Sequence, residues 1–158
     1  MSRYRMPMRT PPRMMPALVT PFTSKGSLDL DAHAFNLTAM HERGITGFLL
    51  GGSTGEGPYL EPGERHALLE TARSAIGEAP FLIAGIMSES LRGAIAQIEE
   101  VEAGGADAVL VLTPTTLTRG RGEYVEGFFK DVGKASKLPV LIYSVPVYSA
   151  YEPSIETI

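Results

Sequence analysis

Five short apolar runs, rich in Val, Ile and Leu, recur about every 30 residues, and this recurrence constrains the fold more than any other feature of the chain. They are residues 17–22, 47–52, 81–86, 107–114 and 139–146. None of them alternates polar with apolar residues, which is typical of strands buried on both faces. Stretches of helical period separate the runs, and this alternation predicts parallel βα units.

The clearest helical stretch lies between the last two runs. Val125, Phe128, Phe129 and Val132 follow the spacing i, i+3, i+4, i+7, which places them on one face of a helix. Near the other end of the chain, Asp29 stands where an N-cap is expected, because short polar side chains accept hydrogen bonds from the first turn of a helix. We therefore expect amphipathic helices packed against a parallel sheet.

Two architectures fit five strands in a chain of 158 residues. A five-stranded doubly wound sheet would be complete at this length, whereas a (β/α)8 TIM barrel takes about 250 residues and would be present only through its first five βα units. In either fold, ligands bind at the carboxyl ends of the strands. Those ends read TPF, GGSTGE, AGIM, LTPTT and YSVP. Length and composition leave both architectures open.

Charge and composition limit the classes of binding partner that the chain is expected to have. The net charge of -4 argues against nucleic acid or an anionic membrane, either of which calls for a basic face, so a small molecule is the expected partner. The chain has no cysteine and no apolar run of about 18 residues, the length that a membrane-spanning helix needs. These features predict a cytoplasmic protein without disulfides.

Residues 1–16 differ in character from the rest. They carry four arginines and four prolines and no acidic residue, and we expect a flexible arm. Residues 17–158 are then expected to form the N-terminal part of a single barrel or sheet domain. The arm lacks the apolar core of a secretory signal.

Common ligand motifs are missing from the strand ends. The segment GGSTGEG has no Walker-type lysine, and its glycines do not fit the dinucleotide pattern, so nucleotide binding is disfavoured. His33, His41 and His66 lie on separate predicted helices without the spacing of metal ligands, and we expect no metal site.

Four strand-end motifs occur together in the order and spacing of one superfamily: VTPF, GGSTGE, LTP and YSVP. The chain resembles the dihydrodipicolinate synthase and N-acetylneuraminate lyase superfamily of class I aldolases, from about residue 16 onward. This resemblance implies the (β/α)8 barrel rather than the doubly wound sheet. It also implies a homo-oligomer, a tetramer in the family, that binds pyruvate or a related 2-oxo acid as a Schiff base on lysine, with no organic cofactor and no metal.

The resemblance also assigns roles to the strand ends. Gly52, Ser53 and Thr54 would hold the carboxylate of the oxo acid, because N–H groups in a Gly-rich bend form an anion-binding concavity and hydroxyls add donors beside it. Tyr143 would carry protons, with Thr54 orienting its phenol. Considered without the resemblance, the same residues could simply form a tight turn and a core tyrosine.

Two positions depart from the family pattern. Thr116 stands where many members have a tyrosine that completes a proton relay with a neighbouring subunit. Val147 and Tyr148 follow Pro146, whereas dihydrodipicolinate synthases place an arginine two residues after this proline. A tyrosine lacks the charged fork that arginine offers a carboxylate, and the difference points away from lysine biosynthesis.

The implied Schiff-base lysine lies on a sixth strand, beyond the five that the sequence shows. The lysines present are Lys25, Lys130, Lys134 and Lys137, and none is predicted at a strand end. We therefore expect a class I aldolase, lyase or synthase whose 158-residue chain is inactive alone. The alternative is a non-catalytic half-barrel that binds an oxo acid or serves as a scaffold.

Overall fold

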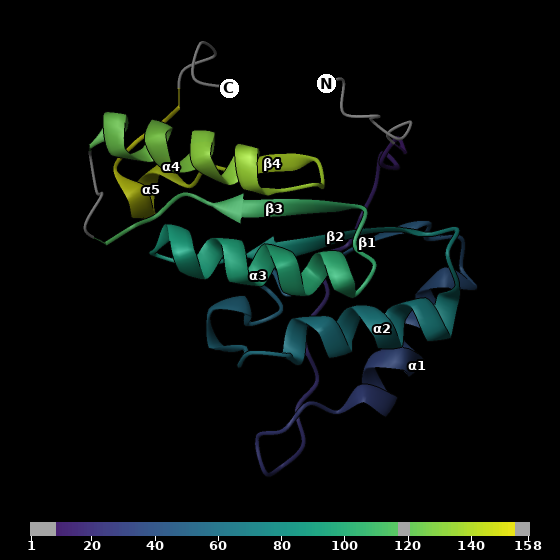
Figure 1. Cartoon of the computed structure of the whole chain (residues 1–158). Helices are drawn as coiled ribbons and strands as arrows, with labels where there is room; N and C mark the ends of the chain where they lie inside the picture. Colours follow the sequence, from purple (N-terminus) through teal and green to yellow (C-terminus); the bar gives the residue numbers. More distant parts are fainter. Residues whose placement is uncertain (1–8, 117–120, 154–158) are drawn as a thin grey trace.

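Helices and strands alternate along the computed structural model of the chain, which describes residues 9–116 and 121–153 (Figure 1). The elements, in chain order, are α1 (Leu30–His41), β1 (Gly47–Leu50), the 3-10 helix η1 (Gly57–Tyr59), α2 (Glu64–Ile76), β2 (Phe81–Ile86), α3 (Leu91–Ala103), β3 (Ala108–Leu112), α4 (Gly122–Ala135), β4 (Val140–Tyr143) and α5 (Pro146–Ser149). The βα alternation predicted from the sequence is confirmed.

The four strands form one parallel sheet in the order β1-β2-β3-β4. A doubly wound sheet reverses its strand order at a switch point, and this sheet has no such reversal. The strictly sequential order is that of a (β/α)8 barrel, in which every strand pairs with its successor. The α/β barrel fold predicted from the sequence is therefore confirmed for the part of the chain that the structure describes.

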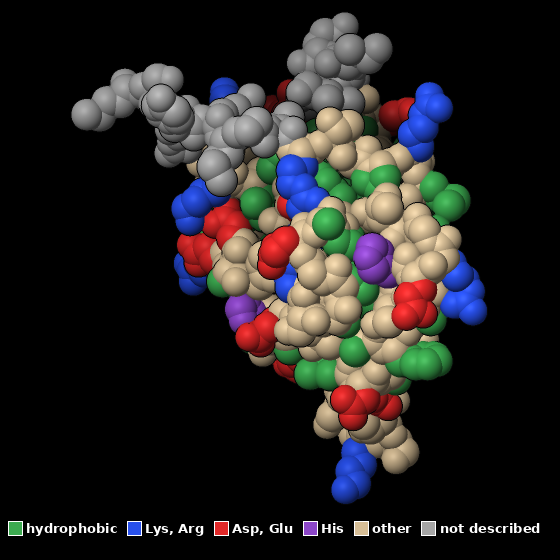
Figure 2. All heavy atoms as spheres, turned by 90° about the vertical axis from the view of Figure 1, so that its right-hand side faces the viewer, with side chains coloured by type: hydrophobic (Ala, Val, Ile, Leu, Met, Phe, Trp, Pro, Cys, Tyr) green, Lys and Arg blue, Asp and Glu red, His purple; other side chains and the backbone are tan. Residues whose placement is uncertain are grey.

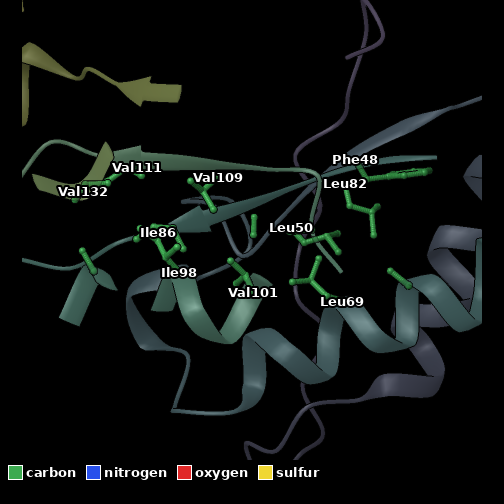
Figure 3. Packing of buried hydrophobic residues seen from close by; sticks show 14 of the residues in the cluster. Phe48, Leu50, Leu69, Leu82, Ile86, Ile98, Val101, Val109, Val111 and Val132 are labelled. Carbon is green, nitrogen blue, oxygen red and sulfur yellow. The ribbon is translucent and has the colours of Figure 1, made fainter. Parts of the chain in front are cut away.

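The main core lies between the sheet and its helices (Figure 3). In β2, Leu82 and Ala84 face this core, whereas Phe81 and Ile83 belong to a second cluster on the opposite face. Such alternation follows from the two-residue period of a strand. Burying one large aliphatic side chain contributes about 1.5–3 kcal/mol, and this core is the main source of stability.

The helical face predicted in the last third of the chain is confirmed. Val125, Phe128, Phe129 and Val132 are all buried on α4, and the two phenylalanine rings meet edge to face at a centroid distance of 5.4 Å. At the first helix, the Asp29 side chain accepts a hydrogen bond from Ala32 N at 2.9 Å, as expected of an N-cap.

The first predicted strand, residues 17–22, is shorter than expected. Ala17 forms one parallel bridge with Leu49, supported by the bonds Leu18 N to Leu49 O and Leu49 N to Pro16 O, both 3.0 Å. Pro16 has no N–H group, so the ladder cannot continue toward the amino end of this segment. The segment lies beside β1, where the first barrel strand belongs, but among the described residues the sheet has four strands.

Part of the predicted arm lies in the described region. Arg9 contacts the loop before β2 and forms an ion pair with Asp107 at 2.8 Å, and Met15 packs against the cluster that contains Phe81. Residues 1–8 lie outside the described residues, and the domain boundary at residue 16 stays a prediction.

The surface carries both signs of charge. Over the face shown in Figure 2, acidic and basic side chains are interspersed rather than gathered by sign. Within the described ranges, no helix is both long enough and apolar enough to cross a bilayer.

Candidate active site

A sharp turn follows β1 at the carboxyl end of the sheet. Gly51 has φ +60°, and the Gly52 carbonyl accepts two hydrogen bonds, from Gly55 N and Gly57 N, each at 3.0 Å. The turn is packed closely, because a Cβ added at Gly57 would lie 2.1 Å from Gly51 O and one added at Gly85 would lie 2.3 Å from it. Only glycine allows this approach of β2 and η1 to the turn.

Ser53 and Thr54 occupy the exposed tip of this turn. Their hydroxyls and backbone N–H groups make no hydrogen bond to any described residue. The Ser53 N–H shares a peptide unit with the Gly52 carbonyl, and the Thr54 N–H shares one with the Ser53 carbonyl, which accepts from Glu56 N at 3.2 Å. Since a hydrogen-bonded carbonyl polarises its own peptide unit, both N–H groups are strengthened as donors. Two amides and two hydroxyls are thus available to an anion.

The segment before the first helix braces the turn from the side. Thr20 is buried, and its Oγ1 donates to Gly55 O at 2.6 Å. A Cβ added at Gly55 would lie 2.8 Å from Leu18 O, so the two backbones are in close contact. The VTPF motif and the GGSTGE motif, distant in sequence, therefore meet in one structural unit.

Arg65, the second residue of α2, lies beneath the turn. Its side chain is buried, with the residue only 4% exposed, and it donates to the carbonyls of Gly57, Leu60 and Gly85. No carboxylate of the described residues lies within ion-pair distance of it. Burial lowers the pKa of Arg65, and the negative charges of Glu100 and Glu64 partly counteract this.

Tyr143 ends β4 and pairs with Leu112. By strand alternation it lies on the same face as Leu141, opposite the helices, which is the face that becomes the barrel interior. Its phenol makes no hydrogen bond to a described residue, Thr54 included. β1 and β4 are the two outer strands of the described sheet, and Thr54 and Tyr143 both lie toward its carboxyl end.

The loop after β3 is held by an acidic side chain. Glu89 accepts hydrogen bonds from Thr115 N at 3.1 Å, Thr115 Oγ1 at 2.8 Å and Thr116 N at 3.0 Å. Burial raises the pKa of Glu89, but the bonds from Thr116 and Thr115 outweigh it and hold the pKa below its usual value. Thr116, which stands in place of the family tyrosine, thus anchors its loop through its backbone.

The remaining predicted candidates lie apart from this turn. The four lysines, Lys25, Lys130, Lys134 and Lys137, are all exposed and lie outside the strands. Val147 and Tyr148 are exposed on the short helix α5. Within residues 9–116 and 121–153, no group of three or more His, Cys, Asp or Glu side chains is arranged to hold a metal ion.

Sequence reasoning missed three contributors: Thr20, Arg65 and Glu89. A signal for Arg65 was present, because it occupies the first position of an apolar face that continues through Leu68, Leu69, Ala72 and Ile76. A charged residue at a core position of an amphipathic helix is expected to have a specific partner. No comparable local signal marks Thr20 or Glu89, whose partners lie 35 and 26 residues away in sequence.

Sequential parallel strands, with a Gly-rich turn at their carboxyl ends, are the arrangement of a (β/α)8 barrel, a class whose active sites lie at that end. The chain matches the dihydrodipicolinate synthetase family over residues 10–158. It belongs to this family.

Individual relatives agree with this assignment. The chain is 37% identical over 134 residues to 4-hydroxy-tetrahydrodipicolinate synthase 1 of Streptomyces coelicolor, a match that covers 85% of this chain and 44% of the relative. It is 34% identical over 143 residues to the 4-hydroxy-tetrahydrodipicolinate synthase of Rhizobium meliloti, covering 90% and 48%. The crystal structure of a dihydrodipicolinate synthase from Bacillus anthracis superposes with a TM-score of 0.81 at 30% identity, covering 89% and 48%. The chain thus spans about half the length of these relatives.

Proposed function

We propose that the chain supplies the carboxylate-binding and proton-transfer part of a class I aldolase site acting on pyruvate or a related 2-oxo acid. One observation carries the proposal. The exposed turn after β1 presents the unpartnered N–H and hydroxyl donors of Ser53 and Thr54 at the carboxyl end of the sheet. Charge-assisted hydrogen bonds of this kind are about twice as strong as neutral ones, so a small carboxylate is a suitable ligand.

Tyr143 and Thr54 complete the proposed chemistry. The phenol lies on the inner face at the same end of the sheet as the turn, and a proton carrier must be within reach of the reacting carbon. Thr54 would contact the carboxylate and orient the phenol. Because no hydrogen bond joins Thr54 to the phenol, the substrate and water between them would complete the path.

The covalent step needs an amine that this chain does not place at the site. An amine nucleophile is activated by burial or by a nearby positive charge, and all four lysines here are exposed. We propose that the Schiff-base lysine lies on a sixth strand, as the resemblance implies. The family and its cited relatives support this lyase assignment, and Tyr148 at the position of the implied arginine favours a substrate other than that of lysine biosynthesis.

Location and assembly form a further part of the proposal. We propose a cytoplasmic homo-oligomer with a small-molecule 2-oxo acid as its partner, not nucleic acid or a membrane. The resemblance supports the oligomer, and the mixed surface charge in Figure 2 suits a solvated surface.

The carboxylate site is tested by binding. Pyruvate is titrated into the 158-residue chain and into the Ser53→Ala/Thr54→Val double variant, with affinity measured by NMR. Removing two hydroxyl donors is expected to weaken pyruvate binding at least about tenfold. Ser24→Ala, an exposed serine in another loop, is the matched control and should bind as the wild type does. Equal affinity of the double variant and the wild type would contradict the proposal.

The covalent step is tested by trapping. Incubating the chain with pyruvate and borohydride should give no site-specific mass adduct, because no buried lysine is available. In a polypeptide that also carries the sixth-strand lysine, one adduct is expected there, and Tyr143→Phe should lower kcat far more than pyruvate affinity. A stoichiometric adduct on Lys25, Lys130, Lys134 or Lys137 would overturn this part of the proposal.

A further inference from the structure

The position of Arg65 is energetically unfavourable for a positively charged side chain. Its side chain is buried, it lies in the first turn of α2, and no carboxylate of the described residues forms an ion pair with it. The amino end of a helix carries a partial positive charge, which disfavours a cation there. A buried charge is usually neutralised by a partner in contact, and among residues 9–116 and 121–153 the direct partners of Arg65 are three backbone carbonyls.

Those carbonyls lie beside the turn of the proposed carboxylate site. Gly57 begins η1 and Leu60 follows its end, and Gly57 N in turn donates to Gly52 O at 3.0 Å. Gly85, near the end of β2, lies directly against Gly51, where an added Cβ would meet the Gly51 carbonyl. From α2, Arg65 therefore contacts two segments that pack against the turn bearing Ser53 and Thr54: residues 57–60 and the end of β2.

A second arginine on the same helix, Arg73, provides a comparison. It makes similar bonds to backbone carbonyls, but unlike Arg65 it also has a carboxylate partner in the described chain. Arg73 also donates to backbone carbonyls, those of Pro80 and Gly105, but it forms an ion pair with Asp107 at 2.9 Å. Its charge is thus neutralised within the chain. The charge of Arg65 is opposed only at longer range, by Glu100 and Glu64.

We propose that Arg65 is a positioning residue that makes this site selective for anions: its bonds fix the turn, and its unpaired charge supplies the positive potential behind the Ser53 and Thr54 donors. This inference rests on the proposed carboxylate site. Coulomb attraction through a partly buried region is strong enough to matter, since two opposite charges 8 Å apart at an effective dielectric constant of 20 change affinity by roughly thirtyfold. The carboxylate of the 2-oxo acid is then the neutralising partner that the chain itself does not provide.

The test compares a charged ligand with a neutral one of the same shape. Affinities for pyruvate and for pyruvamide are measured by NMR with the wild-type chain, Arg65→Gln, Arg65→Lys and the matched control Arg73→Gln. Arg65→Gln is expected to weaken pyruvate binding about tenfold more than it weakens pyruvamide binding, because both ligands lose the fixed turn but only pyruvate loses the attraction to the charge. Arg65→Lys should retain most of the pyruvate affinity, and Arg73→Gln should retain the wild-type preference for pyruvate.

The outcomes separate this inference from the proposed function. If the wild-type chain binds no pyruvate, both fail. If it binds pyruvate and a folded Arg65→Gln variant loses affinity for both ligands equally, or for neither, the inference alone is overturned. If the Arg65→Gln variant does not fold, the pyruvate affinity of the Arg65→Lys variant tests the inference instead. Loss of all pyruvate affinity in a folded Arg65→Lys chain with native Gly55 and Gly57 amide resonances would overturn the electrostatic role.

Discussion

The two ends of the parallel sheet are built from similar residues but use them differently. At the amino ends, the Asp107 carboxylate accepts from Arg9 at 2.8 Å, from Arg73 at 2.9 Å and from Leu82 N at 2.8 Å. At the carboxyl ends, Arg65 has no carboxylate in contact, and donors of Ser53 and Thr54 have no partner in the described chain. We call the amino ends of the strands the closed end, because ion pairs within the chain satisfy the charged groups there. We call the carboxyl ends the open end, because a charge and several hydrogen-bond donors there have no partner in the described chain.

This difference shows how a barrel separates stability from function. Interactions that satisfy one another hold the fold together, and nothing further can bind to them. Groups left unsatisfied cost stability, and they persist where a ligand completes them. The same helix, α2, contributes Arg73 to the first kind of end and Arg65 to the second.

The largest effect is expected from breaking the closed end. Asp107→Asn removes the negative charge that Arg73 and Arg9 share, and it leaves the largely buried Arg73 without its closest carboxylate. Losing one partner of a buried ion pair costs roughly 3 kcal/mol of unfolding free energy. Urea unfolding measures this loss. If the two ends are separate in function, the folded fraction of the variant still binds pyruvate as the wild type does.

A smaller effect is expected from crowding the open end. Gly57→Ala places a Cβ against the Gly51 carbonyl, and forced contacts of this kind cost about 2 kcal/mol. The variant should also lose pyruvate binding, because the turn must move. Gly133→Ala is the matched control in α4, where an added Cβ meets nothing, and it should be neutral or stabilising. Unfolding curves that rank these two substitutions in the opposite order would contradict the packing described.

The smallest effect comes from a group between the two ends. His33 on α1 is buried, and its Nε2 donates to Leu68 O at 3.3 Å, while its Nδ1 has no partner among the described residues. Burial lowers the pKa of His33, and the bond to Leu68 opposes this only in part. The unfolded chain therefore takes up a proton at a higher pH than the folded chain does.

Stability is then expected to be complete above the unfolded histidine pKa, about 6.5, and to fall as the pH drops below it. The loss is at most about 1.4 kcal/mol per pH unit. His33→Leu should remove this contribution, which is measured as the difference in unfolding free energy between pH 7 and pH 5.5. An unchanged pH dependence in the variant would exclude His33 as its source.

The local sequence pattern was sufficient to predict most of the fold and part of the candidate site. The apolar face of α4 and the position of the Gly-rich turn follow from spacing within one element. The strand at residues 17–22 was overestimated, because its apolar character predicts burial but not how many of its backbone groups pair with β1. The role of Tyr143 stays a prediction, since its phenol has no described partner.

The closed end could not have been predicted from local pattern. Arg9 and Arg73 lie 98 and 34 residues from Asp107 in sequence, and only the sequential strand order brings them together. Arg65 was detectable as a charged residue within an apolar helical face, but its partners are backbone carbonyls, which no residue type reveals. Contacts made through the backbone are the part of a site that a sequence shows least.

The most direct test of the account asks which end of the sheet binds the ligand. Pyruvate is titrated into the uniformly 15N-labelled 158-residue chain, and amide shifts are mapped along it. The Ser53 and Thr54 amides are expected to shift most and to move downfield, with smaller changes at Gly55 and Gly57. Amides at the amino ends, including Leu82, should not respond. Saturable shifts centred on Leu82 and Asp107, or no saturable shift at Ser53 and Thr54, would contradict the assignment of the carboxyl end as the binding site.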